Sequence, residues 1–219
     1  MREIVFDTET TGLSPQNGGR IFEIGMVELQ NRVPTGRKVW HFINPEKELS
    51  AESTRITGVE NHQLVGKPVF REIVDEIIDF IGEDGILVAH NASFDMSFLN
   101  YELELCGKNY IQNQVVDTLS LAKKNLPGAR HSLDALCKRF NVEKHSEREV
   151  HGALLDAELL VEVYIELTGG LQAALSLETS NKTIVYTTET IKLSRAPLVH
   201  PPRPHEAENA GFWRKKMPA

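Results

Sequence analysis

The stretch Phe6-Asp7-Thr8-Glu9-Thr10-Thr11-Gly12 follows a short apolar run near the start of this 219-residue chain. The run, Glu3–Phe6, is β-branched and predicts a strand. Side chains two apart on a strand point to the same face, so we expect Asp7 and Glu9 to lie side by side at the rim of a sheet. Such carboxylates repel each other unless a cation lies between them, and hard oxygen ligands suit Mg²⁺ or Mn²⁺. Taken alone, the pair also fits a solvated acidic turn.

The residues around these acids are candidate substrate contacts. Gly12 permits a tight turn, so backbone N–H groups and the hydroxyls of Thr8 and Thr10 can approach a nucleotide closely. Phe94, from the second segment below, completes the predicted set of substrate-binding residues.

The second segment is His90-Asn91-Ala92-Ser93-Phe94-Asp95, which follows a predicted buried strand at 86–89. Ser93 is the expected N-cap of the helix that begins there. We expect Asp95 to bring a third carboxylate to the same rim, with a pKa lowered by the helix N-terminus. Capping of the first helical turn is the alternative role for Asp95.

The third segment is His151-Gly152-Ala153-Leu154-Leu155-Asp156. Residues five apart differ by about 140° around a helix, so His151 and Asp156 cannot share one helical face. The favoured arrangement places Asp156 inside the helix, facing the sheet rim, and His151 on the preceding loop. A buried Asp is costly unless it is paired or binds a metal, and a loop His near a metal-activated water is suited to act as a general base. An ordinary surface histidine is the alternative.

The remaining pattern predicts an α/β domain over residues 1–170. Two further strands, 20–29 and 38–43, are separated by a turn at Pro34-Thr35-Gly36 and form an antiparallel meander with the first strand. Helical spacing then alternates with short buried strands, the expected helices being 68–81, 93–106, 132–140 and 153–167 and the expected strands 86–89 and 115–116. This order favours a mixed sheet flanked by helices. Residues 171–219 are Thr/Ser-rich and then proline-rich, and predict an extended, flexible tail.

The composition is that of a globular protein, with 41% hydrophobic and 25% charged residues. No apolar stretch reaches the length of a membrane span, and the first apolar run is too short for a signal peptide, so we expect a cytoplasmic protein without a membrane partner. Cys106 and Cys137 are expected to be buried thiols in a reducing compartment.

The net charge of −7 is unevenly distributed along the chain. Residues 171–219 hold seven Lys/Arg and four Glu, a balance of +3, which leaves −10 for residues 1–170. An acidic domain binds a polyanion poorly by itself. The charge therefore favours a subunit to which a partner delivers the nucleic acid.

Together the three segments resemble the DnaQ-like, DEDDh exonuclease family, whose pattern is D-x-E, a central Asp and H-x₄-D. The five positions fall on Asp7, Glu9, Asp95, His151 and Asp156 without substitution. The resemblance covers roughly residues 3–168. The sequence at 131–137, 151–157 and 164–170 is most similar to the epsilon-type proofreading subunits of bacterial DNA polymerase III. One departure is Thr57-Gly58-Val59, where the family often has His-Gly-Ile, which affects the expected nucleotide contacts.

The resemblance implies a ribonuclease-H-like fold and a 3′→5′ exonuclease that releases nucleoside 5′-monophosphates from a single-stranded 3′ end of DNA. It implies that Asp7, Glu9, Asp95 and Asp156 bind two Mg²⁺ or Mn²⁺ ions, about 3.5–4 Å apart, and that His151 accepts the proton of the attacking water.

The start of the tail resembles a sliding-clamp-binding peptide. In residues 172–177, Gln172, Leu175 and Leu177 match the pattern Gln-x-x-Leu-x-(Leu/Phe). A chance match or helix-end packing is the alternative.

The end of the tail places aromatic residues beside basic ones. Phe212 and Trp213, within 205–219, are followed by Arg214, Lys215 and Lys216. Exposed aromatics of this kind usually have a partner, and the resemblance implies the catalytic (alpha) subunit of the polymerase. The same resemblance allows for a small third core subunit.

Two other functions fit the same residues less well. A stand-alone DEDDh exonuclease acting on RNA or oligoribonucleotides would use the same five residues but has little need of a partner-binding tail. A non-catalytic adaptor between polymerase and clamp would not need four clustered acids.

Overall fold

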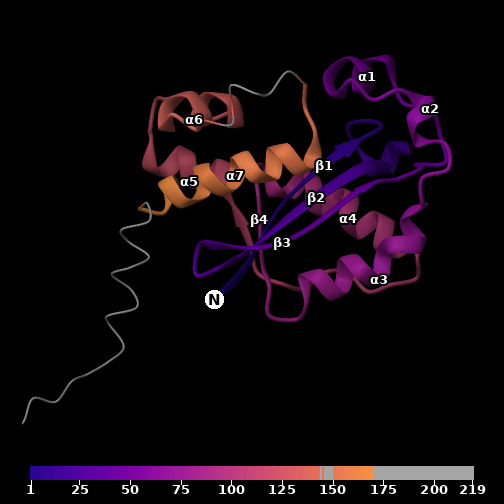
Figure 1. Cartoon of the computed structure of the whole chain (residues 1–219), viewed down its shortest axis with the longest axis horizontal. Coiled ribbons are helices and arrows are strands. Elements are labelled where there is room, and N and C mark those ends of the chain that lie inside the picture. The colour runs from indigo at the N-terminus through magenta and orange to yellow at the C-terminus, as the bar shows by residue number, and fades with distance from the viewer. Residues whose placement is uncertain (144, 146–149, 170–219) are drawn as a thin grey trace, which may run out of the picture. The chain divides into compact units, whose positions relative to one another are not determined.

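The computed structural model describes residues 1–143, 145 and 150–169 (Figure 1). In these residues five strands form one mixed sheet of order β3-β2-β1-β4-β5. The first three strands pair antiparallel, and β4 and β5 run parallel to β1. The strands are β1 (Arg2–Thr10), β2 (Ile21–Gln30), β3 (Val33–Phe42), β4 (Ile86–Ala89) and β5 (Val115–Asp117). The predicted antiparallel meander and mixed sheet are confirmed.

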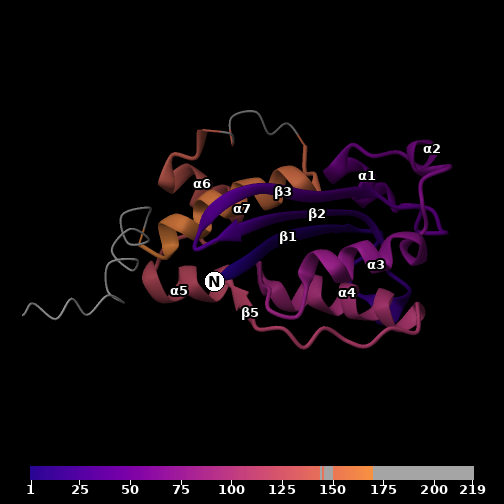
Figure 2. The same ribbon diagram turned by 60° about the horizontal axis from the view of Figure 1, so that its bottom comes forward.

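Helices cover both faces of this sheet, with α7 on one face and α3 and α4 on the other (Figure 2). The helices are α1 (Ala51–Thr57), α2 (Asn61–Leu64), α3 (Phe70–Ile81), α4 (Ala92–Leu105), α5 (Thr118–Asn125), α6 (Leu133–Phe140) and α7 (Ala153–Leu167), and a 3₁₀ turn, η1, spans Pro15–Asn17. Within the described residues no helix is both long and apolar enough to cross a membrane.

The predicted tail, 171–219, lies outside the described residues. The same holds for the clamp-like peptide 172–177, with Gln172, Leu175 and Leu177, and for the polymerase-binding end 205–219, with Phe212 and Trp213.

Alternating side chains on β1 build two separate cores. Ile4 and Phe6 pack with α3 and α4, whereas Val5 packs with α7. Glu3 also faces α7, because its Oε1 accepts a hydrogen bond from the Tyr164 hydroxyl at 2.9 Å. Odd-numbered residues of β1 therefore point toward α7, and even-numbered residues point toward α4.

The turn between β2 and β3 is not where the sequence pattern predicted it. Asn31 and Arg32 make the turn, with φ of 52° and 66°, and Pro34-Thr35-Gly36 lies inside β3. Two central residues with positive φ suit the right-handed twist of a two-residue hairpin. The pairing of β2 with β3 shifts register opposite the Pro-Thr-Gly segment, where Gly36 has φ of 86°. This segment is a bulge that a composition-based prediction mistakes for a turn.

The predicted N-cap Ser93 is also wrong, because α4 begins two residues earlier. Asn91 is the N-cap, with φ of 64°, and Ser93 lies in the first turn. The backbone N–H of Asn91 donates to Asp117 Oδ1 at 2.9 Å, and that of Ala92 reaches the same oxygen at 3.4 Å. The acceptor comes from a residue 26 positions away, so a local capping pattern cannot reveal it.

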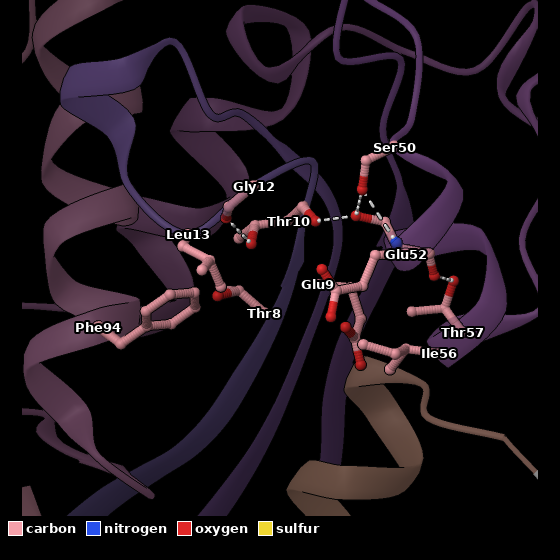
Figure 3. Close-up of a pocket in the computed structure, with 11 residues that line it drawn as sticks. Thr8, Glu9, Thr10, Gly12, Leu13, Ser50, Glu52, Ile56, Thr57 and Phe94 are labelled. Carbon is pink, nitrogen blue, oxygen red and sulfur yellow. Dashed lines mark hydrogen bonds between the residues drawn. The ribbon is translucent and has the colours of Figure 1, made fainter.

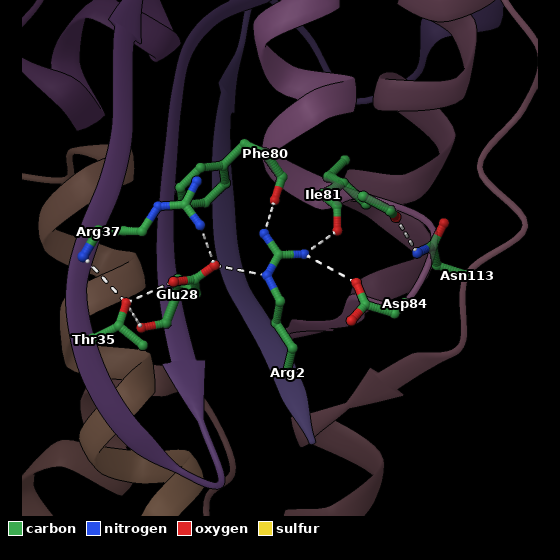
Figure 4. Close-up of polar contacts among 9 residues, drawn as sticks. Arg2, Glu28, Thr35, Arg37, Phe80, Ile81, Asp84 and Asn113 are labelled. Atoms are coloured by element: carbon green, nitrogen blue, oxygen red, sulfur yellow. Dashed lines mark hydrogen bonds and ion pairs between the residues drawn. The ribbon is translucent and has the colours of Figure 1, made fainter.

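At the N-terminal end of β1, Arg2 joins three elements (Figure 4). Its Nε lies 2.6 Å from Glu28 Oε1 on β2, and its terminal nitrogens donate to the carbonyl oxygens of Phe80 and Ile81 at the end of α3. Thr35 and Arg37 of β3 also donate to Glu28. This cluster satisfies helix-end carbonyls and fixes β1 against α3.

We expect Arg2→Met to lower the free energy of unfolding by about 3 kcal/mol, because it leaves a buried carboxylate with fewer partners. The contacts from Thr35 and Arg37 keep the loss near the low end of the range for a broken buried pair. Urea denaturation measures the change. Asp84→Ala is the matched control, since Asp84 is 79% exposed and 3.6 Å from Arg2, and we expect a change below about 0.5 kcal/mol. An equal loss of unfolding free energy in the two variants would contradict the stabilising role of Arg2.

Candidate active site

Asp7 and Glu9 lie on the face of β1 that points toward α7, as their odd numbering requires. Asp7 is paired with Gly25 of β2, and Glu9 with Glu23. A Cβ on Gly25 would lie 2.4 Å from backbone atoms of Leu154, so this part of the sheet contacts the first turn of α7 directly. The two carboxylates therefore lie next to that turn.

Glu9, His151 and Asp156 form the closest cluster of metal-ligating groups among the described residues. One ligand atom from each lies within 4.8 Å of the other two. His151 Nδ1 is 3.1 Å from Asp156 Oδ2. Asp156 is buried in the first turn of α7, and His151 is half-exposed on the loop before it, as predicted. The histidine loop is attached to α1 through a hydrogen bond from the His151 N–H to the Ile56 carbonyl, 3.2 Å long.

Asp95 approaches β1 from the opposite face, in the first turn of α4. Its Oδ1 accepts hydrogen bonds from the Thr8 N–H at 3.1 Å and the Thr8 hydroxyl at 2.7 Å. Thr8 lies between Asp7 and Glu9 in sequence, so Asp95 reaches the same end of β1 from the α4 side. Burial raises the pKa of Asp95 to about 7, although the two Thr8 hydrogen bonds oppose the rise. The expected lowering of this pKa is therefore wrong, because desolvation outweighs the helix N-terminus.

A cavity of about 210 Å³ adjoins Glu9 (Figure 3). All four predicted substrate residues line it, namely Thr8, Thr10, Gly12 and Phe94. Leu13 faces Phe94 at one end of the cavity in Figure 3, and Leu13 is 87% exposed. The cavity therefore combines an apolar end with hydroxyl and carboxylate groups.

Helix α1 forms the other wall of this cavity, which the sequence pattern did not predict. Ser50, Glu52, Ser53, Ile56 and Thr57 contribute to it. The Ser53 hydroxyl donates to the Thr10 carbonyl at 3.1 Å, which joins α1 to the end of β1. Thr57 begins the segment that departs from the family pattern. This departure was the feature of the sequence that could have indicated the wall formed by α1.

A further buried acid, Glu23 on β2, was also not predicted. It is 3% exposed, and Trp40 Nε1 donates to its Oε1 at 2.7 Å. Burial raises the pKa of Glu23, with a further contribution from the nearby negative charge of Asp156. Glu23 is therefore part of the acidic surroundings of the cluster.

Residues 4–164 match the family described as exonuclease (RNase T). The chain belongs to this exonuclease family. The epsilon subunit of DNA polymerase III from Rickettsia typhi is 45% identical to this exonuclease over 224 residues, covering 98% of this chain and 96% of the relative. The epsilon subunit from Escherichia coli K12 is 42% identical over 177 residues, covering 77% and 72%. The predicted resemblance to epsilon-type subunits is confirmed.

Solved structures agree with the exonuclease fold. Exonuclease X in complex with 5′-overhanging duplex DNA superposes with a TM-score of 0.60 at 24% identity, covering 82% of this chain and 93% of that one. The nuclease domain of 3′hExo, a DEDDh family member bound to rAMP, gives 0.65 at 16% identity, covering 76% and 91%. The predicted ribonuclease-H-like fold is confirmed, and with the family and its relatives it identifies a 3′→5′ exonuclease.

Proposed function

We propose that this exonuclease is the proofreading subunit of a bacterial replicative DNA polymerase. It would remove nucleotides from a single-stranded 3′ end of DNA and release nucleoside 5′-monophosphates. The observation that carries the proposal is the cluster of Glu9, His151 and Asp156 beside the cavity of about 210 Å³, in a chain similar to epsilon subunits over 98% of its length.

Asp7, Glu9, Asp95 and Asp156 are the proposed ligands of two divalent cations, Mg²⁺ or Mn²⁺. The donor set fits such ions, because carboxylate oxygens are the ligands that they prefer. Glu9 and Asp156 lie in one cluster, and Asp95 reaches the same end of β1 through its contact with Thr8. When bound, the ions would lower the pKa of the attacking water and offset negative charge on the phosphate and the leaving 3′-oxygen.

His151 is the proposed general base. An imidazole titrates near neutral pH, and this one is half-exposed on the loop at the edge of the cluster. Its Nδ1 lies 3.1 Å from Asp156 Oδ2, a contact that orients the ring. His151 would accept the proton of the water that attacks the scissile phosphate.

The cavity is the proposed binding site of the 3′-terminal nucleoside. Leu13 and Phe94 would contact the base, while Thr8, Thr10 and Gly12 would contact the sugar and phosphate. These contacts do not require a particular base. Selectivity for errors would come from the lower cost of unpairing a mismatched end, which delivers a single strand more often.

The proposed partners follow from the tail and from charge. Residues 172–177, through Gln172, Leu175 and Leu177, would bind the sliding clamp. The end 205–219, through Phe212 and Trp213, would bind the alpha subunit, and a small third subunit would complete a cytoplasmic core. The −10 charge of residues 1–170 supports delivery of DNA by these partners.

The test is release of nucleotides from 5′-labelled single strands of DNA and RNA of equal sequence. We expect faster degradation of DNA, dependence on Mg²⁺ and complete inhibition by EDTA. A chain truncated after residue 170 should keep this activity on free strands but lose binding to the alpha subunit and the clamp. Preference for RNA would favour the stand-alone ribonuclease. Inactivity of well-folded protein on both strands would favour the adaptor.

A further inference from the structure

Helix α7 carries Asp156 in its first turn but lacks a capping side chain of its own. Its N-cap residue is Gly152, and no side chain of the cap accepts a hydrogen bond from the helix. The first N–H groups of a helix require an acceptor, and a negative charge there is favoured by the helix dipole.

Glu23 supplies this acceptor from the sheet. The backbone N–H of Ala153, the first residue of α7, is a hydrogen-bond partner of the Glu23 carboxylate. A methyl group on Gly152 would lie 3.8 and 3.9 Å from the two Glu23 oxygens, so the carboxylate lies directly against the cap. Trp40 Nε1 holds Oε1 at 2.7 Å, which fixes the orientation of the acid.

Gly25 is the next residue of β2 on the same face, and it lets the strand backbone approach α7 closely. A Cβ on Gly25 would lie 2.4 Å from both N and Cα of Leu154. The backbone of β2 and the first turn of α7 are thus in direct contact. Asp156 belongs to that turn, because its N–H donates to the Gly152 carbonyl at 2.9 Å.

We propose that Glu23 is a positioning residue, which caps α7 from β2 and thereby holds Asp156 and His151 opposite Glu9. Glu23 acts through the helix: its carboxylate contacts Trp40 and the start of α7. The role rests on the proposed metal-binding function of the cluster. In that function, Glu23 sets the positions of Asp156 and His151 relative to Glu9.

The experiment compares Mn²⁺ binding to the full chain and its variants by isothermal titration calorimetry, with the melting temperature recorded for each. We expect Glu23→Ala to weaken Mn²⁺ binding at least about tenfold, as is typical when a group that supports metal ligands is removed. Glu23→Gln keeps one acceptor oxygen, so its affinity should fall between those of the parent and Glu23→Ala. If Glu23→Ala does not fold, Glu23→Gln provides the same comparison.

Glu28→Ala is the matched control for stability. Glu28 is also a buried acid of β2 with several donors, but it lies toward the other end of the strand and faces the other side of the sheet (Figure 4). We expect it to lower the melting temperature and leave Mn²⁺ affinity within twofold. Equal affinity of the parent and Glu23→Ala, or equal weakening by Glu28→Ala, would overturn the positioning role alone. A parent protein that binds no Mn²⁺ would overturn the proposed function as well.

Discussion

Asp156→Ala is expected to lower the rate of nucleotide release roughly 10³-fold or more, equivalent to about 4 kcal/mol of barrier, while the protein stays folded. Asp156 is 3% exposed, and its Oδ2 lies 3.1 Å from His151 Nδ1. One substitution therefore removes a proposed metal ligand and the group that orients the proposed base. Shortening of the 5′-labelled strand at saturating Mg²⁺ measures the effect.

In the absence of metal ions, Asp156→Ala should be at least as stable as the parent protein, because the variant carries one buried charge fewer beside Glu9 and Glu23. Glu158→Ala is the matched control. Glu158 lies on the same helix two residues further on and forms a surface ion pair with Lys38, so its loss should change the rate less than twofold. Nuclease activity of Asp156→Ala close to that of the parent would refute the site.

The second large effect is expected for Gly25→Ala. The added methyl group would lie 2.4 Å from the backbone of Leu154, so either β2 or the first turn of α7 must move. Overpacking of this kind typically costs 1–3 kcal/mol, and we expect about 3 kcal/mol because the neighbouring atoms belong to the backbone. A displacement near 1 Å would also misplace Asp156, and we expect about 10²-fold lower activity at a temperature where the variant is folded.

Urea denaturation and the labelled-strand assay measure these two effects separately. Gly12→Ala is the control for folding, because a Cβ at Gly12 would meet nothing within 4 Å. Its melting temperature should match that of the parent. A Gly25→Ala protein with parental stability and activity would show that strand and helix are not in close contact.

Local patterns predicted most of the architecture. The alternation along β1 is enough to place Asp7 and Glu9 on one face, since successive strand residues point to opposite sides. Helical spacing predicted α7, which spans Ala153–Leu167 in the structure. Both signals depend only on neighbours in sequence, and the segment His151–Asp156 could therefore be assigned to a loop followed by a helix.

Apart from the misplaced turn between β2 and β3, the failures share one physical cause, which is dependence on distant residues. The start of α4 is stabilised by Asp117, and the pKa of Asp95 is set by burial between α4 and β1. The wall formed by α1 and the cap supplied by Glu23 likewise join segments far apart in the chain. Periodicity does not record such contacts.

The sequence by itself determined the strand and helix pattern and the identity of the five candidate site residues, because these follow from side-chain spacing and chemistry. Only the tertiary structure decided which groups meet: Glu9 with His151 and Asp156, Asp95 with Thr8, and Glu23 with the first turn of α7. These contacts arise when α4 and α7 pack on opposite faces of β1, since that packing removes the acids from water and sets the distances between them.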